Sequence, residues 1–325
     1  MYKFSSSATI LIATFFALAI TFIDFFLLIN FTDIGDRINY LTFADNIDSY
    51  FVNLYSNSLL TLFRQEPFWS LVFYLLNWIG LSSIASIRLI IFISSFIAFF
   101  IMIDKNRIPL YALIFIIFFD WFIGNYVNAL RMAFASSIFL FSWFYLKGIK
   151  QKIIWALTPL VHYSFFILLG LVWLESYFKK IKLSVDISVA ITFIAGVSFG
   201  LLVFIAATFL GFGNLSDRYS EFEGIFSLSL GPIFFLFILI IFLLQDNEFK
   251  QKNLFSIMVI TFYIASVIFF PPISRILISS ILLVLISGFS IKSYYKFLFI
   301  IMIFMYTSYF LVSGKLYELL FPLAL

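Results

Sequence analysis

The chain has no cysteine and a single histidine, His162, among its 325 residues. The absence of cysteine excludes disulfides, thiol nucleophiles and thiolate metal sites, and it leaves the redox compartment open. One histidine and scattered carboxylates argue against a transition-metal centre, so we expect no metal and no cofactor. Charge is also scarce, since 11% of the residues are Asp, Glu, Lys or Arg. No polar segment carries a basic stripe, which argues against nucleic acid as a partner.

The chain is rich in apolar residues, which make up 64% of it. A soluble domain has about half apolar residues and about a quarter charged ones, so this composition indicates an integral membrane protein. The apolar runs are continuous and do not alternate, which favours helices over the strands of a barrel. The first run has no small-residue cleavage site and is expected to remain as a span. The sequence therefore predicts an all-α polytopic membrane protein that forms one domain, 1–325.

We expect about ten transmembrane helices, because a span needs about 20 apolar residues. The candidate spans are 8–30, 84–103, 108–124, 127–146, 184–211, 232–245, 253–270, 276–290 and 297–313.

Two further runs fit a full crossing poorly. The run 66–80 has only about thirteen apolar residues, too few for a core of roughly 30 Å. The run 153–178 is broken at Thr158 and Pro159 and has lysine clusters on both sides, which belong on one face of the membrane. Both runs are predicted to be re-entrant, with His162 near the tip of the second. The polar segments 31–67 and 212–231 are predicted to be outer loops.

In this topology most lysines and most arginines lie on opposite faces of the membrane. Twelve of the 13 lysines fall on the cytoplasmic face, whereas five of the seven arginines fall on the outer face. Short cytoplasmic loops favour positive charge, so arginines on the outer face need another reason. The guanidinium group binds phosphate or carboxylate through two parallel hydrogen bonds, so these arginines indicate an anionic ligand. The alternative for each is a structural pair with a loop carboxylate. Arg88, inside a span, is expected to be a buried partner of Asp24 or Asp104.

Several short motifs resemble those of a known family. Asn128, Arg131 and Ala135 lie in NALRMAFA, and His162 lies in LVHYS. Glu66 begins EPFW, which follows the segment GDRINY at 35–40. Together these motifs resemble the EpsG and Wzy-like family of polysaccharide repeat-unit polymerases, which includes the O-antigen polymerases. Met132 stands where that family usually has glutamine, which puts the contacts of that glutamine in doubt.

The resemblance implies a membrane glycosyltransferase of the bacterial cytoplasmic (inner) membrane, with its active site facing the periplasm. Its donor and acceptor would be oligosaccharide repeat units on undecaprenyl diphosphate, as in lipopolysaccharide or exopolysaccharide synthesis. The growing chain would pass from its lipid diphosphate to a sugar hydroxyl of another lipid-linked unit. A chain-length regulator is a further candidate partner.

Roles follow for the polar residues in and near the matching segments and for the arginines predicted on the outer face. The diphosphate ligands are predicted to be Arg131, Arg218 and Arg275. The catalytic base is His162 or one of two carboxylates, Glu66 and Asp36, since histidine titrates near neutral pH. Asn125, Tyr126 and Asn128 are predicted to bind sugar or, alternatively, to hold Arg131. Trp69 and Trp121 could stack on sugars, but an interfacial belt is the favoured interpretation for both.

Two other functions compete with polymerisation. A transporter or flippase for a lipid-linked saccharide would show broken helices in matching positions of two halves. A membrane acyltransferase would use His162 as its base, but no second polar partner stands next to this histidine. The acidic residues Asp217, Glu221 and Glu223 have wider spacing than hard-cation sites usually have, which again predicts no metal.

Overall fold

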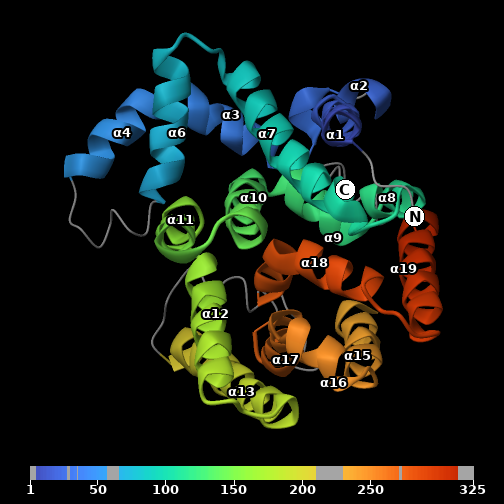
Figure 1. Ribbon diagram of the computed structural model, residues 1–325. Coiled ribbons are helices and arrows are strands. Elements are labelled where there is room, and N and C mark those ends of the chain that lie inside the picture. The colour runs from blue at the N-terminus through green and yellow to red at the C-terminus, as the bar shows by residue number, and fades with distance from the viewer. Residues whose placement is uncertain are drawn as a thin grey trace. The chain divides into compact units, whose positions relative to one another are not determined.

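The computed structural model describes residues 5–27, 30–34, 36–56, 66–209, 230–270 and 273–313, and every regular element in these ranges is a helix (Figure 1). The prediction of an all-helical protein is confirmed for this part of the chain. The packing divides the chain into two compact units, Met1–Phe166 with Ile303–Leu325, and Ile167–Met302. The boundaries between the units fall inside two helices, α12 (Phe165–Lys180) and α19 (Tyr295–Val312). The single domain 1–325 expected from the sequence stays a prediction.

The first unit contains most of the helices in the N-terminal half. They are α1 (Ser6–Thr21), α2 (Ile23–Leu27), η1 (Phe31–Asp33), α3 (Arg37–Asp45), α4 (Ile47–Ser56), α6 (Pro67–Trp78), α7 (Ser83–Ile103), η2 (Asp104–Asn106), α8 (Leu110–Ile117), α9 (Asp120–Ile123), the π-turn η3 (Gly124–Asn128), α10 (Leu130–Tyr145) and α11 (Gly148–Val161). Helix α7 packs against α1 and α10, and α10 packs in turn against α11 (Figure 1). Small buried residues on α1, Ala13 and Ala17, are four positions apart and allow the close approach of α7.

The second unit contains α12 (Phe165–Lys180), α13 (Val185–Phe209), α15 (Leu230–Leu243), α16 (Asn247–Lys252), α17 (Leu254–Val267), α18 (Ser274–Phe289) and the first part of α19 (Tyr295–Val312). Two glycines set the contact of α13 with α17. A Cβ on Gly196 would lie 2.8 Å from the Phe262 carbonyl oxygen, and one on Gly200 would lie 2.8 Å from that of Ser266. The two backbones therefore pack closely, as they do in membrane helices with small residues four apart.

Among the described residues, three helices are long and apolar enough to cross a membrane: Ser83–Asn106, Val185–Ala206 and Tyr295–Val312. A fourth candidate is the bent pair Leu110–Ile117 and Asp120–Asn128, whose axes differ by 71°. Five more apolar helices have 14 to 16 residues each. At 1.5 Å per residue these helices are about 21 to 24 Å long, shorter than a hydrocarbon core of about 30 Å. The described part of the chain thus has helical membrane character, with fewer full-length candidates than ten.

Several element boundaries differ from the sequence prediction. The expected span 8–30 divides at Phe22 into α1 and α2. The expected outer loop 31–67 folds, where it is described, into η1, α3 and α4. The expected joint at Gly124 and Asn125 is a π-turn, and the sharp bend lies earlier, between Ile117 and Asp120. The second outer loop, 212–231, lies outside the described residues except for the start of α15.

Helix α11 continues through Pro159 to Val161, so the expected break at Thr158 and Pro159 is wrong by about one turn. Proline cannot donate to the carbonyl four residues before it, here that of Trp155. The Thr158 hydroxyl donates to this oxygen at 2.7 Å instead. A threonine before the proline therefore replaces the missing hydrogen bond, and the helix ends only at His162.

Candidate functional site

The Glu66 carboxylate is the point at which three predicted site residues meet. Its Oε2 accepts a hydrogen bond from Arg131 Nη1 at 2.7 Å. Its Oε1 lies 2.7 Å from His162 Nδ1 and accepts the Tyr163 backbone N–H at 3.3 Å. Both carboxylate oxygens are thus occupied by groups 65 to 97 positions away in the sequence. All four residues belong to the first unit.

The backbone at Glu66 is strained. Glu66 precedes Pro67, the first residue of α6, and has φ 53° and ψ 65°. A residue before proline avoids the right-handed helical region, and a side chain other than glycine rarely adopts positive φ. Such strain costs about 1 to 3 kcal/mol and is found mainly where the surrounding structure enforces it, often at functional sites. The strained conformation points the carboxylate away from solvent, since Glu66 is 1% exposed.

Arg131 and His162 come from the ends of two adjacent helices. Arg131 is the second residue of α10, which begins one residue after the π-turn, and π-turns inside helices are frequent at functional sites. His162 follows the last residue of α11 in an extended conformation, with φ −152° and ψ 118°. The chain turns through Tyr163 and Ser164 before α12 begins. Two helix ends therefore bring a cation and an imidazole to one carboxylate.

The Glu66 carboxyl is held in its ionised form. Burial favours its neutral form, but the hydrogen bond with His162 and the charge of Arg131 outweigh burial and lower the pKa of Glu66 below its ordinary value. A carboxylate with both oxygens bonded and a lowered pKa is a poor base. Its bond to Nδ1 fixes the imidazole instead. Among the described residues, no other group hydrogen-bonds to the His162 ring, which leaves Nε2 available.

A cavity of about 330 Å³ lies beside this cluster, on the Arg131 side. It is lined by Asp36, Asn39, Tyr40, Thr42, Phe43, Tyr50, Trp69 and Arg131. The Arg131 side chain is 45% exposed although it is bonded to Glu66. Its guanidinium carbon lies 5.9 Å from the centre of the Tyr40 ring, which packs edge-on against Trp69. The volume falls in the range of small-molecule sites, and aromatic and hydrogen-bonding side chains share the wall.

Helix α3 supplies much of the polar wall. Asp36, at its start, is exposed and accepts a hydrogen bond from Asn39 Nδ2 at 3.4 Å. Asp36, Asn39 and Tyr40 are spaced at i, i+3 and i+4, which places them on one helix face. Burial raises the pKa of Tyr40 above its ordinary value, although the charge of Arg131 opposes this, so the phenol keeps its proton. Of these residues sequence reasoning selected only Asp36, although the helical spacing within GDRINY was a usable signal.

The three predicted sugar ligands lie in or next to the π-turn and do not line the cavity. Asn125 and Tyr126 are 1% and 0% exposed, and Asn125 Nδ2 donates to Ser136 on α10 at 3.4 Å. Asn128 is half-buried. The structure places Asn125 and Tyr126 in the packing of α10, where they support the turn that precedes Arg131. Their predicted contact with sugar stays a prediction.

The roles of Arg218 and Arg275 as anion ligands stay predictions. Arg275 is exposed on α18 in the second unit. Arg218 lies outside the described residues, as do Asp217, Glu221 and Glu223. Arg88 is confirmed as a structural partner of Asp24, since its Nη1 and Nη2 bond the two carboxylate oxygens at 3.1 and 2.6 Å.

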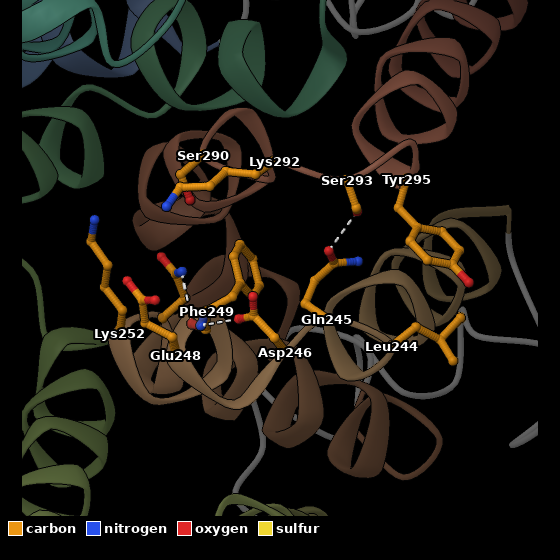
Figure 2. A pocket seen from close by; sticks show the side chains of 11 residues that line it. Leu244, Gln245, Asp246, Glu248, Phe249, Lys252, Ser290, Lys292, Ser293 and Tyr295 are labelled. Carbon is orange, nitrogen blue, oxygen red and sulfur yellow. Dashed lines mark hydrogen bonds between the residues drawn. The ribbon is translucent and has the colours of Figure 1, made fainter.

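A second cavity, of about 230 Å³, lies in the second unit between the α15–α16 turn and the α18–α19 turn (Figure 2). Ser293 donates across it to Gln245 at 2.7 Å, and the side chain of Asp246 caps α16 (Figure 2). Two lysines and two acids among its lining residues balance in charge. It contains none of the predicted site residues.

The described residues contain no cluster of three or more potential metal ligands among His, Cys, Asp and Glu. Comparison of the chain with protein-family models, with curated proteins and with solved structures finds no match. The functional conclusion therefore rests on the cluster and its neighbouring cavity.

Proposed function

We propose that the chain is a membrane glycosyltransferase that polymerises oligosaccharide repeat units carried on undecaprenyl diphosphate. The observation that carries this proposal is the Glu66 carboxylate, which holds His162 by Nδ1 and Arg131 by Nη1 at the edge of an aromatic and polar cavity. The motif resemblance described above gives the substrate class. The proposed topology has about ten spans, with the cluster on the periplasmic face of a bacterial inner membrane.

In the proposed reaction His162 is the base. With Nδ1–H donating to Glu66, the neutral imidazole presents an unprotonated Nε2 to the acceptor. Nε2 takes the proton of the acceptor sugar hydroxyl, and the hydroxyl oxygen bonds to the anomeric carbon of the donor. The bond from that carbon to the diphosphate oxygen breaks, and its electron pair leaves with the lipid diphosphate.

Arg131 stabilises the charge that develops on the leaving diphosphate. One of its nitrogens is held by Glu66, and the exposed remainder of its side chain faces the cavity. A cation fixed before the reaction stabilises a developing negative charge without reorganisation at the moment of transfer. Glu66 is a positioning residue in this scheme, because it orients both groups and contacts neither substrate. Asp36 and Asn39 are exposed and offer polar partners for a sugar, beside the buried rings of Tyr40 and Trp69.

Chain lengthening by purified protein tests the proposal. The chain is reconstituted in vesicles with a lipid-linked repeat unit, and products are separated by length. The proposal expects a ladder of longer glycans in the wild type and lengthening that is slower by about a hundredfold or more in His162→Gln. A wild type that produces no product longer than one unit, in vesicles where the protein is folded, would contradict it.

The bend between α8 and α9 supports a second function. Two short helices bent by 71° at a break of two residues resemble the discontinuous helices of transporters, so translocation of the same lipid-linked saccharide is the second candidate. The same vesicles distinguish the two functions when the lipid-linked unit is supplied on one side only. Movement of the lipid to the other leaflet without lengthening supports the transporter, and lengthening supports the polymerase.

A further inference from the structure

Arg37 is a fully buried cation without a hydrogen-bond acceptor in the described part of the chain. It is 0% exposed, and none of its three guanidinium nitrogens has a partner there. Burial of an unpaired charge is among the most costly arrangements in a folded protein, and buried charges are paired or bind ions. The position of Arg37 therefore indicates a missing anion.

A second guanidinium lies close by. Both guanidinium groups contact the ring of Phe31. The guanidinium carbon of Arg37 lies 4.4 Å from the centre of this ring, and the guanidinium carbon of Arg88 lies 4.7 Å from it. Arg88 already bonds both oxygens of Asp24 and the Thr21 carbonyl, so Asp24 is engaged with Arg88. We call Arg37, Arg88 and the Phe31 ring that both of them contact the double-arginine site.

Among the described side chains, the double-arginine site has an excess of one positive charge, because two arginines lie near one aspartate, Asp24. Burial lowers the pKa of Arg37 to about 10; the charge of Asp24 opposes this change, and that of Arg88 adds to it. The guanidinium therefore stays protonated at neutral pH. Arg37 is also the first residue of α3, where the helix dipole adds partial positive charge.

We propose that the double-arginine site binds a phosphate-class oxyanion with one net negative charge, such as a phosphodiester. Forked guanidinium groups match phosphate oxygens through paired hydrogen bonds, and one such charge neutralises the excess. Phe31, on the single turn η1, is half-exposed between the exposed residues Asn30 and Thr32. Movement of this ring toward solvent gives the anion access to both arginines. The proposal does not depend on the polymerase function or on the cluster at Glu66.

The test uses the effect of phosphate on the thermal midpoint of the full chain in phosphate-free nonionic detergent. A ligand that binds only the folded state raises the midpoint as its concentration rises. We expect inorganic phosphate or added phosphatidylglycerol to raise the wild-type midpoint. Arg37→Met is expected to show no response. In the absence of phosphate its midpoint should exceed that of the wild type, because the unpaired buried charge is gone. Lys150→Gln removes one exposed positive charge from the same unit and should keep the wild-type response.

The two ligands identify the source of the phosphate group. A response to both shows that the phosphate group alone is bound, and a response to phosphatidylglycerol only assigns the site to a lipid headgroup. The proposal is wrong if the wild type responds to neither ligand, or if Arg37→Met responds as the wild type does. A lower midpoint of Arg37→Met at every phosphate concentration would also overturn it and would indicate a carboxylate of the chain, such as Asp33, as the partner. If Arg37→Met does not fold, Arg37→Lys replaces it and should show a weaker response than the wild type.

Discussion

Substitution of Glu66 by Gln removes the charge that connects Arg131 and His162 while it keeps the size of the side chain. A hydrogen bond to a charged group contributes about 1.5 to 3 kcal/mol, and this estimate applies to the buried contact with His162. The contact with Arg131 adds about 1 kcal/mol or less, because that side chain is 45% exposed. Glu66→Gln should therefore lower the free energy of unfolding by about 2 to 4 kcal/mol.

Glycan lengthening should fall by at least about a hundredfold in Glu66→Gln, because both reacting groups lose their orientation. The assays are denaturation in detergent, followed by intrinsic fluorescence, and lengthening in vesicles. The matched control is Glu175→Gln. Glu175 is also a buried carboxylate, and it pairs with Lys179, whose side chain is 46% exposed. This control should lose about 1 kcal/mol or less and keep its activity.

The effect of Glu66→Gln on stability should also depend on pH. Because the pKa of Glu66 is lower in the folded protein than its ordinary value of 4.5, its ionisation stabilises the fold fully above pH 4.5. This contribution is lost as the pH falls through the folded-state pKa. The difference between wild type and variant should therefore be constant near neutral pH and shrink in acid. Equal stability and equal lengthening at neutral pH would refute the role assigned to Glu66.

Three further predictions concern the arginine, the histidine and the packing of the second unit. Arg131→Lys should retain the pair with Glu66 but lose at least about tenfold in lengthening, because an ammonium group cannot bond two phosphate oxygens in parallel; normal lengthening would contradict the anion role. His162→Gln should reduce lengthening by about a hundredfold or more and leave a flat pH profile, and an unchanged profile would exclude His162 as the base. Gly196→Ala should destabilise the protein by about 1 to 3 kcal/mol, measured by denaturation, because the new Cβ would lie 2.8 Å from the Phe262 carbonyl oxygen; an unchanged midpoint would show that α13 and α17 can separate.

The sequence predicts the residues of the cluster better than their arrangement. Arg131 and His162 are visible as charged or titratable groups within apolar surroundings, where such groups are costly. Glu66 stands at the end of a polar segment and is indicated by the resemblance of EPFW. That Glu66 joins the other two could not be read from the chain, because a contact between positions 65 and 96 residues apart leaves no local pattern. Arg88 was paired correctly with Asp24 as one of two candidates, because few acids lie near the membrane-embedded segments.

The boundaries of the helices were harder to predict for physical reasons. Polarity was taken as a loop signal over 31–67, yet α3 and α4 form there with polar faces around a cavity. Pro159 was taken as a helix break, but the Thr158 hydroxyl bonds the carbonyl that the proline leaves free. Asn125 and Tyr126 are predicted to contact sugar or to hold Arg131, and their contact with sugar stays a prediction. The π-turn places both in the interior of the first unit. In each case a hydrogen bond or a packing contact decides the result, and neither follows from composition.

The most direct measurement concerns the single histidine. With only one imidazole in the chain, 15N-labelled histidine gives the NMR signals of His162 alone once any affinity tag is removed. If Glu66 holds Nδ1–H and leaves Nε2 free for the acceptor hydroxyl, the neutral ring of the wild type should be the Nδ1–H tautomer. Glu66→Gln should shift this tautomer equilibrium. A wild-type ring protonated on Nε2, or one whose signals do not change in Glu66→Gln, would contradict the proposed site.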